Sequence, residues 1–199
     1  MNLPSYFIIF DTEYTSWKGS QERNWNGKNE YKEIVQISGF KINKKKSHLE
    51  IIDKIDIIVK PKINPLLSEY FINLTGITQK KVEKEGIQIE KANEIFYNFC
   101  KNNNQEIPLY SYGNDFKILE ENFNYIQIPN DSKFRKWKKY FFDIRNIFEK
   151  YIDVKKYTSG TVYKSLNIIP NKKIEIHNSL WDSYSLFITL DYLYKKDIN

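Results

Sequence analysis

The sequence predicts an α/β fold in which helices flank a mixed five-stranded sheet. Short segments rich in β-branched and aromatic residues alternate along the chain with amphipathic segments of helical period. Helical segments follow the third, fourth and fifth expected strands, which is typical of an α/β sandwich. The chain has 199 residues, 41% of them hydrophobic, and no linker or repeat divides it. We therefore expect a single domain over residues 1–199.

The first three strands are expected in the N-terminal third of the chain. Residues 7–13 form an apolar run that suits a buried strand, and residues 33–42 alternate in part between apolar and polar side chains. Residues 48–59 give the third strand. A lysine-rich turn at residues 44–47 separates the last two, so we expect them to form a hairpin. Residues 18–32 are polar and are interpreted as a loop.

Helices are expected in the central part of the chain. Gly76 ends a first helical turn, and Thr78 can cap a short helix at residues 80–85. Residues 90–101 have the period of an amphipathic helix. Its expected inward side chains are Ile95, Phe96 and Phe99.

Strands and helices alternate again in the C-terminal half. The expected strands are residues 108–112 and 140–144, and the expected helices are residues 115–125, 145–151, 159–166 and 179–195. Between the two strands, residues 133–139 are basic and contain Trp137. This segment has two interpretations. It is either a flank that binds a nucleic-acid strand or a solvated loop with Trp137 in the core.

Composition narrows the class of protein. The formal net charge of +6 is compatible with a polyanionic partner, but the basic residues are almost all lysine, as the codon bias of an AT-rich gene produces. Cys100 is the only cysteine, which excludes an intramolecular disulfide and a cysteine-based metal site. The sequence carries neither a signal peptide nor a segment long enough to span a bilayer, so we expect a cytoplasmic protein with no membrane partner.

The first expected strand ends in two acids that are separated by one residue, Asp11 and Glu13. Residues two apart in a strand point to the same side, so both carboxylates leave the edge of the core together. Two such charges need a cation, or one of them must take a proton. One interpretation is a site for divalent metal ions. The other is that Asp11 only ends the strand while Glu13 is solvated.

Asp115 and Asp182 each stand at the head of an apolar helical stripe. Asp115 shares a helix face with Ile118 and Leu119, and Asp182 shares one with Leu186. Further apolar members of the two faces are Ile126, Leu190 and Leu193. A favourable charge at a helix N-terminus would explain either aspartate alone. Four carboxylates directed at one core favour metal, and oxygen ligands suit Mg²⁺ or Mn²⁺ rather than zinc.

His177 precedes Asp182 by five residues. Within a helix this spacing would put the two on opposite sides, so His177 reaches the acids only if residues 176–178 form a loop. Asn178 and Ser179 are good cap residues and allow this. A histidine there could take a proton from water, whereas the alternative is a surface histidine, the role expected for His48.

The ordered set Asp11-x-Glu13, Asp115 and His177-x₄-Asp182 resembles the DEDDh family of 3′–5′ exonucleases, which have an RNase H-like fold. The resemblance covers nearly the whole chain. It implies a five-stranded mixed sheet flanked by helices, a metal cofactor and a nucleic-acid substrate.

Other segments of the sequence also agree with this resemblance. Residues 33–37 look like the second strand of the family, and residues 74–78 look like its loop beside the terminal nucleoside. Trp17 together with Leu67 and Ser68 looks closest to the Eri and KapD-like branch.

The resemblance also implies roles for individual residues. Four acids would bind two ions, Mg²⁺ or Mn²⁺, and one histidine would act as general base. The implied metal ligands are Asp11, Glu13, Asp115 and Asp182, and the implied base is His177. Thr12 and Tyr14 would line the terminal nucleotide, and Leu74, Gly76 and Ile77 would pack on its sugar or base.

Two positions depart from the pattern of the branch. Asp115 follows Gly113 after one residue, where many Eri-type members have two, and Trp181 stands where an acid is common. We expect a metal-dependent 3′–5′ exonuclease that releases nucleoside 5′-monophosphates from the 3′ end of DNA or RNA, single- or double-stranded. The alternatives are a non-catalytic nucleic-acid-binding or polymerase-associated module on the same fold, and a defence effector that degrades foreign DNA.

Overall fold

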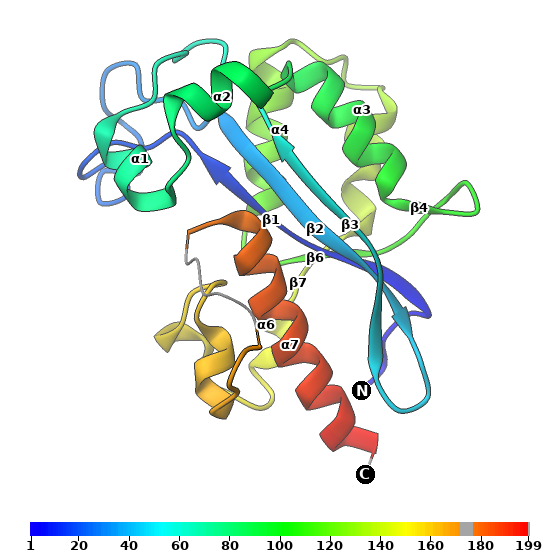
Figure 1. Cartoon of the computed structure of the whole chain (residues 1–199). Helices are drawn as coiled ribbons and strands as arrows, with labels where there is room; N and C mark the ends of the chain where they lie inside the picture. The colour runs from blue at the N-terminus through cyan, green and yellow to red at the C-terminus, as the bar shows by residue number, and fades with distance from the viewer. Residues whose placement is uncertain (172–176, 199) are drawn as a thin grey trace.

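A mixed sheet forms the centre of the computed structural model, which describes residues 1–171 and 177–198. The strand order is β3-β2-β1-β6-β7 (Figure 1). The strands are β1 (Tyr6–Tyr14), β2 (Ile34–Lys44), β3 (Leu49–Ile58), β6 (Leu109–Ser111) and β7 (Phe141–Asp143). The first three are antiparallel neighbours, whereas β6 runs parallel to β1 and β7 runs parallel to β6. The predicted five-stranded mixed sheet and its β2–β3 hairpin are confirmed.

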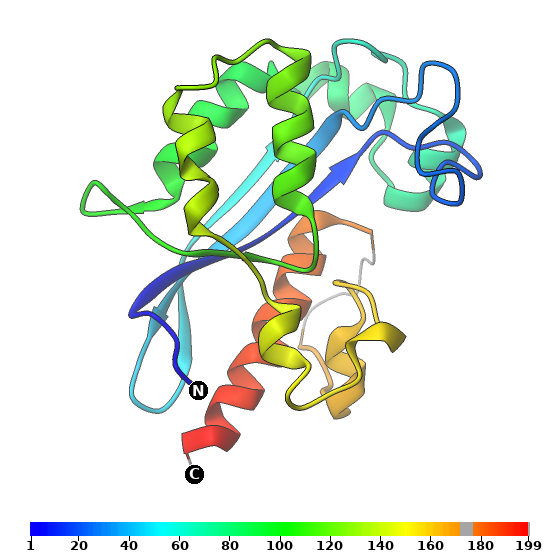
Figure 2. The same cartoon turned by 180° about the vertical axis from the view of Figure 1, so that it is seen from behind.

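Helices cover both faces of the sheet (Figures 1 and 2). On one face lie α3 (Ile89–Phe99) and α4 (Asp115–Tyr125), and their apolar side chains join a core with β1. On the other face lie α6 (Arg145–Phe148) and α7 (Ser179–Ile198), which share a second core with the same strand. None of the described helices is both long enough and apolar enough to cross a membrane.

The alternation of side chains along β1 decides which core each residue enters. Ile8 and Phe10 belong to the core beneath α3 and α4, whereas Phe7 and Ile9 belong to the core beneath α7. Residues 11 and 13 continue the alternation of Phe7 and Ile9, so they point to the same face. The two acids of the strand therefore emerge on the face that α7 covers.

Shorter elements complete the chain. Two short helices, α1 (Glu69–Thr75) and α2 (Gln79–Glu85), lie near the start of β2 (Figure 1). Gly76 ends α1 at a φ of 72°, and the side chain of Thr78 accepts from Lys81 N at the start of α2, as predicted. Other elements are β4 (Lys101–Asn102), β5 (Gln105–Glu106), α5 (Lys133–Lys136), η1 (Trp137–Tyr140), η2 (Val154–Lys156) and η3 (Val162–Leu166), where η marks a 3₁₀ helix.

Two predictions about the helices are wrong. Ile95 is 38% exposed, because the buried face of α3 runs through Ala92 and Phe96, and its neighbour Ile95 is turned about 100° away. The helix expected at residues 159–166 is only a 3₁₀ helix, η3, that begins at Val162.

Trp137 decides between the two interpretations of the basic segment. It is 2% exposed, and its ring lies 5.5 Å from that of Phe96 and 4.9 Å from that of Phe141. Burial in this aromatic cluster leaves it unable to stack on bases. The core interpretation of Trp137 is therefore confirmed.

Candidate functional site

Three carboxylates meet where β1 passes beneath the start of α7. Asp11, Glu13 and Asp182 each offer one oxygen atom, and these atoms all lie within 4.8 Å of one another. Asp11 and Asp182 are buried, at 6% and 4% exposure, and Glu13 is partly buried. The structure thus brings together three of the four acids of the predicted metal site at one point.

A polar network holds the first turn of α7 against β2. Gln36 and Ser38 lie opposite Glu13 and Asp11 in the sheet register. Ser179 donates its backbone N–H to Gln36 Oε1 at 3.2 Å and its hydroxyl to Ser38 Oγ at 2.7 Å. The Ser183 hydroxyl donates to the Ser38 carbonyl at 3.1 Å, and the four residues of this network are fully buried. These bonds place Asp182 beside the acids of β1.

Asp115 reaches the site from the opposite face of the sheet. It is the first residue of α4, which follows β6, the parallel neighbour of β1. Thr12 points to this face and donates to Asp115 Oδ1 twice, from its N–H at 3.1 Å and from its hydroxyl at 2.7 Å. Asp115 is 8% exposed. The short spacing after Gly113 has therefore not removed this acid from the site.

His177 lies in the turn before α7 and lines the same cavity as the acids. The side chain of Asn178 caps the helix by accepting from Leu180 N at 3.1 Å. Ile176, the first residue of the predicted loop, lies outside the described residues. Burial lowers the pKa of His177, so its imidazole is neutral near pH 7 and can accept a proton.

The acids repel one another and are poorly solvated. Burial is the main cause that raises the pKa of Asp11 and Glu13 well above their usual values, and the neighbouring acids raise it further. Burial raises the pKa of Asp182 to about 7, against a hydrogen bond from Ser159. It raises that of Asp115 to about 6, against the two bonds from Thr12. The site stabilises negative charge poorly without a cation.

The donor set fits a hard divalent cation. Within the described residues, none of the four acids forms an ion pair with lysine or arginine, and the buried Asp182 Oδ1 has no hydrogen-bond partner. A buried unpartnered carboxylate oxygen is costly unless a ligand satisfies it. The ligands are all oxygen atoms, which suit Mg²⁺ or Mn²⁺.

A cavity of about 530 Å³ opens over the acids. Of the residues predicted to contact a terminal nucleotide, Thr12, Tyr14 and Leu74 line it. Gly76 and Ile77 are not among its described lining residues. Ile77 is 1% exposed and packs in a small core beneath α1 and α2, so its side chain is not available to a ligand.

Sequence reasoning missed several residues of the site. Ser159 donates its hydroxyl to Asp182 Oδ2 at 2.9 Å, but its segment was expected to be helical, which hid this turn. Trp25 lies in a segment interpreted only as a polar loop, where a lone tryptophan was the available signal. Others that line the cavity are Lys32, Tyr112, Lys117 and Tyr157.

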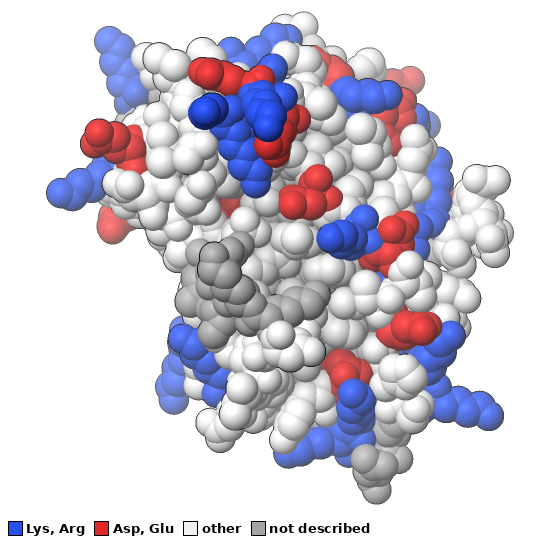
Figure 3. Space-filling view, in the orientation of Figure 1, with Lys and Arg blue, Asp and Glu red and all other residues white. Residues whose placement is uncertain are grey.

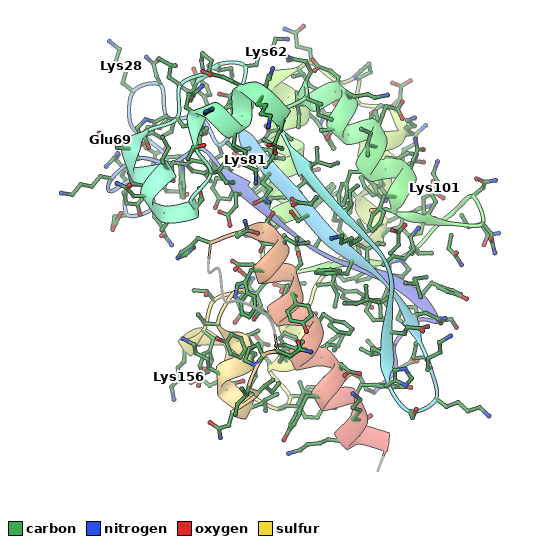
Figure 4. The ribbon with its side chains drawn as sticks, viewed as in Figure 1. Lys28, Lys62, Glu69, Lys81, Lys101 and Lys156 are labelled. Atoms are coloured by element: carbon green, nitrogen blue, oxygen red, sulfur yellow. The ribbon has the colours of Figure 1, made fainter. Side chains whose placement is uncertain are left out.

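Basic residues do not gather in one place on the face seen in Figure 3, where lysine and arginine are interspersed with acids. Lys28, Lys62 and Lys156 point outward from the rim of the molecule (Figure 4). In the basic segment, Lys133 pairs with Glu94 and Lys138 with Glu120. Basic residues on this face therefore form no continuous patch.

Comparison with known proteins decides the family. The sequence model of a family described as Exonuclease matches residues 8–187. The chain belongs to this exonuclease family. Its fold is similar to that of the nuclease domain of 3′hExo, a DEDDh family member bound to rAMP, with a TM-score of 0.77, 20% identity and coverage of 96% of this chain and 92% of that one.

Two curated relatives are Eri proteins. The chain is 33% identical over 85 residues to ERI1 exoribonuclease 2 of Xenopus laevis, covering 43% of this chain and 11% of that protein. It is 33% identical over 103 residues to the 3′-5′ exonuclease eri1 of Schizosaccharomyces pombe, covering 52% and 32%. The matches thus span a third or less of these relatives. The resemblance to the Eri branch of the DEDDh exonucleases is confirmed.

Proposed function

We propose that this exonuclease-family chain is a metal-dependent 3′–5′ exonuclease that hydrolyses the terminal phosphodiester bond of RNA or DNA and releases nucleoside 5′-monophosphates. The observation that carries the proposal is the meeting of Asp11, Glu13 and Asp182 within 4.8 Å, in a cavity that Asp115 and His177 also line. Few other chemistries require several poorly solvated acids without a cationic partner at one point.

The four acids Asp11, Glu13, Asp115 and Asp182 would hold two divalent ions, Mg²⁺ or Mn²⁺. Such ions, when bound, activate water and stabilise negative charge on the leaving oxygen. His177 has a neutral imidazole because burial lowers its pKa, and it would accept the proton of the attacking water. Thr12 orients the Asp115 carboxylate, and Ser159 orients that of Asp182.

We propose RNA as the better substrate. One curated relative is named an exoribonuclease, and a related structure describes recognition of a histone mRNA stem-loop by 3′-exonuclease. The cavity volume, about 530 Å³, falls within the range of small-ligand sites. Thr12, Tyr14 and Leu74 would then contact the terminal nucleotide.

A time course with matched end-labelled RNA and DNA strands, single- and double-stranded, in Mg²⁺ or Mn²⁺ tests this function. We expect stepwise shortening from the 3′ end, release of 5′-mononucleotides and complete inhibition by EDTA. His177→Ala removes the proton acceptor and Asp182→Asn removes a charged ligand, so each should slow release by at least about 100-fold.

His48→Ala is the matched control, since His48 is exposed and contacts Ser47 rather than the cavity. It should keep full activity, and all three variants should melt cooperatively. Retained activity in both His177→Ala and Asp182→Asn would refute the proposal. Tight binding of a strand without any shortening would instead support a non-catalytic binding module.

A further inference from the structure

The loop that joins β1 to β2 forms one wall of the cavity, beside α1 (Figure 1). Thr15 and Glu33 join the two ends of this loop. The Thr15 N–H donates to the Glu33 carbonyl at 2.8 Å, and the Thr15 hydroxyl accepts from Glu33 N at 2.9 Å. On this wall, the loop contributes an aromatic ring, that of Trp25, and a positive charge, that of Lys32. Other loop residues on it are Ser16, Ser20, Gln21 and Asn24.

Trp25 is held in one orientation by three contacts. Its backbone N–H donates to the Ser20 carbonyl at 2.7 Å, and its indole Nε1 donates to the Thr15 carbonyl at 2.9 Å. Its ring centroid lies 5.4 Å from that of Tyr14, the last residue of β1. The indole is therefore fixed to the end of the strand that carries the acids.

The backbone of Trp25 is strained. Its φ of 55° lies in the left-handed region, which bulky side chains rarely adopt. Most other described non-glycine residues with positive φ are asparagines, which tolerate this conformation. Among the described non-glycine residues with positive φ, Trp25 and His177 carry aromatic rings, and both line the cavity. Such strain persists where the surrounding structure enforces it, and it concentrates at functional sites.

Trp25 is not needed to fill a hydrophobic core. Trp25 belongs to none of the three hydrophobic cores of the described residues, and its neighbours Asn24 and Asn26 are exposed. Lys32 Nζ lies 4.8 Å from the indole centroid and 3.9 Å from Glu121 Oε1. Lys32 Nζ lies over one face of the indole ring. A flat ring with a cation at this position matches a nucleotide, because bases stack on aromatic rings and lysine neutralises phosphate.

We propose that Trp25 and Lys32 form a platform on which an unpaired base near the 3′ end of the substrate strand stacks, with its phosphate beside Lys32. This inference rests on the proposed exonuclease function. Bases in a duplex are already stacked and paired. The platform therefore makes the enzyme prefer single-stranded 3′ ends.

Steady-state kinetics on a single-stranded oligonucleotide test the platform. Trp25→Ala should raise KM about 5- to 150-fold, the range for loss of one base–aromatic stack, while kcat stays near that of the wild type. Trp25→Phe should restore most of the loss, because it keeps a ring. Trp17→Ala is the matched control, since Trp17 lies in the same loop but is not among the described residues that line the cavity.

A strand with abasic residues at its 3′ end separates stacking from loop folding. On this strand Trp25→Ala and the wild type should have the same KM, because no base remains to stack. An unchanged KM for Trp25→Ala on the ordinary strand, or an equal increase on both strands, would overturn the platform. An equal KM in Trp17→Ala and Trp25→Ala would also overturn it.

The proposed function fails by a different result, namely no shortening of any strand by the wild type. In that case the same variants are compared by equilibrium binding of the labelled ordinary and abasic strands, with the same expectation for Kd. Lys32→Gln should lower the slope of log Kd against log salt concentration by about one. An unchanged slope would remove Lys32 from the platform.

Discussion

Gly160 fixes the position of the Asp182 carboxylate. A Cβ built on Gly160 would overlap Asp182 Oδ1 and lie 2.9 Å from Cγ. The neighbouring Ser159 donates to the other oxygen, and Trp181 Nε1 donates to the Gly160 carbonyl at 3.0 Å. The carboxylate thus occupies the space that a Cβ at position 160 would fill, with Oδ1 left for a ligand.

Gly160→Ala should therefore impair activity without unfolding the protein. The added methyl group displaces the carboxylate, and misplacement of a catalytic group by about 1 Å can cost on the order of 100-fold in rate. Gly160 does not have a positive φ, so alanine fits the backbone there. We expect a loss of at least about 10-fold in kcat/KM and weaker Mn²⁺ binding by titration, with a melting temperature near that of the wild type. Wild-type Mn²⁺ affinity in the variant would contradict this account of Gly160.

The same residues show what the sequence could and could not reveal. Asp11, Glu13, Asp115 and Asp182 stand out because each is the acid at an end of an apolar strand or helix stripe. The supporting groups have no such signal. Ser159 and Gly160 act through a turn that packs against α7, and this contact depends on tertiary structure rather than on local pattern.

The attachment of α7 to β2 sets the geometry of the site among the elements. Ser179 and Ser183 bond to Gln36 and Ser38, and Asp56 accepts from Gln36 Nε2 and Ser38 Oγ at 2.8 and 2.7 Å. Buried polar groups of this kind specify one docking position, because any shift leaves them unpaired. A helix held only by apolar contacts would locate Asp182 less sharply.

Ser179→Ala should loosen this attachment. Loss of the hydroxyl that donates to Ser38 should lower the free energy of unfolding by about 1 kcal/mol and weaken Mn²⁺ binding, since Asp182 lies one turn further along α7. Urea denaturation and Mn²⁺ titration measure the two effects.

Thr189→Val is the control for Ser179→Ala, because this buried hydroxyl on the same helix donates to Ser185 within α7. It should leave Mn²⁺ affinity unchanged. Equal Mn²⁺ affinities in Ser179→Ala and Thr189→Val would show that the network does not position the site.

Strands and long helices could be predicted because their periodicity records which face is buried. The alternation along β1 also correctly put both acids on one side. The pairing of Ser38 with Asp11 could not be predicted, since it depends on sheet register. Ile95 was misassigned because neighbouring apolar residues of α3 compete for the buried face, and only packing against β1 selects Phe96.

On the face seen in Figure 3 the lysines and arginines are dispersed, whereas the acids of the site are concentrated at one point. The net charge is +6, yet Lys133 and Lys138 are paired with acids of neighbouring helices. The four carboxylates of the site have no such partners among the described residues. Without a cation, ionisation of these groups opposes folding.

This opposition links the stability of the metal-free protein to pH. The pKa of Asp115 is raised to about 6 and that of Asp182 to about 7. Between about pH 4 and pH 7 the unfolded chain has ionised these groups, whereas the folded protein keeps them protonated and binds more protons. The free energy of unfolding therefore falls as pH rises through this window. His177 acts in the opposite direction, because burial lowers its pKa.

We expect protein treated with EDTA to melt at a lower temperature at pH 8 than at pH 5, as followed by circular dichroism. Asp182→Asn should reduce this decrease, because asparagine does not titrate and the remaining acids repel one another less. Saturating Mg²⁺ should reverse it in the wild type, since the cation binds the ionised carboxylates of the folded state alone. Two results would contradict the assignment of Asp182 to a buried acidic cluster that a cation completes. One is a melting temperature of the EDTA-treated wild type that rises from pH 5 to pH 8. The other is a decrease in melting temperature that Asp182→Asn leaves unchanged.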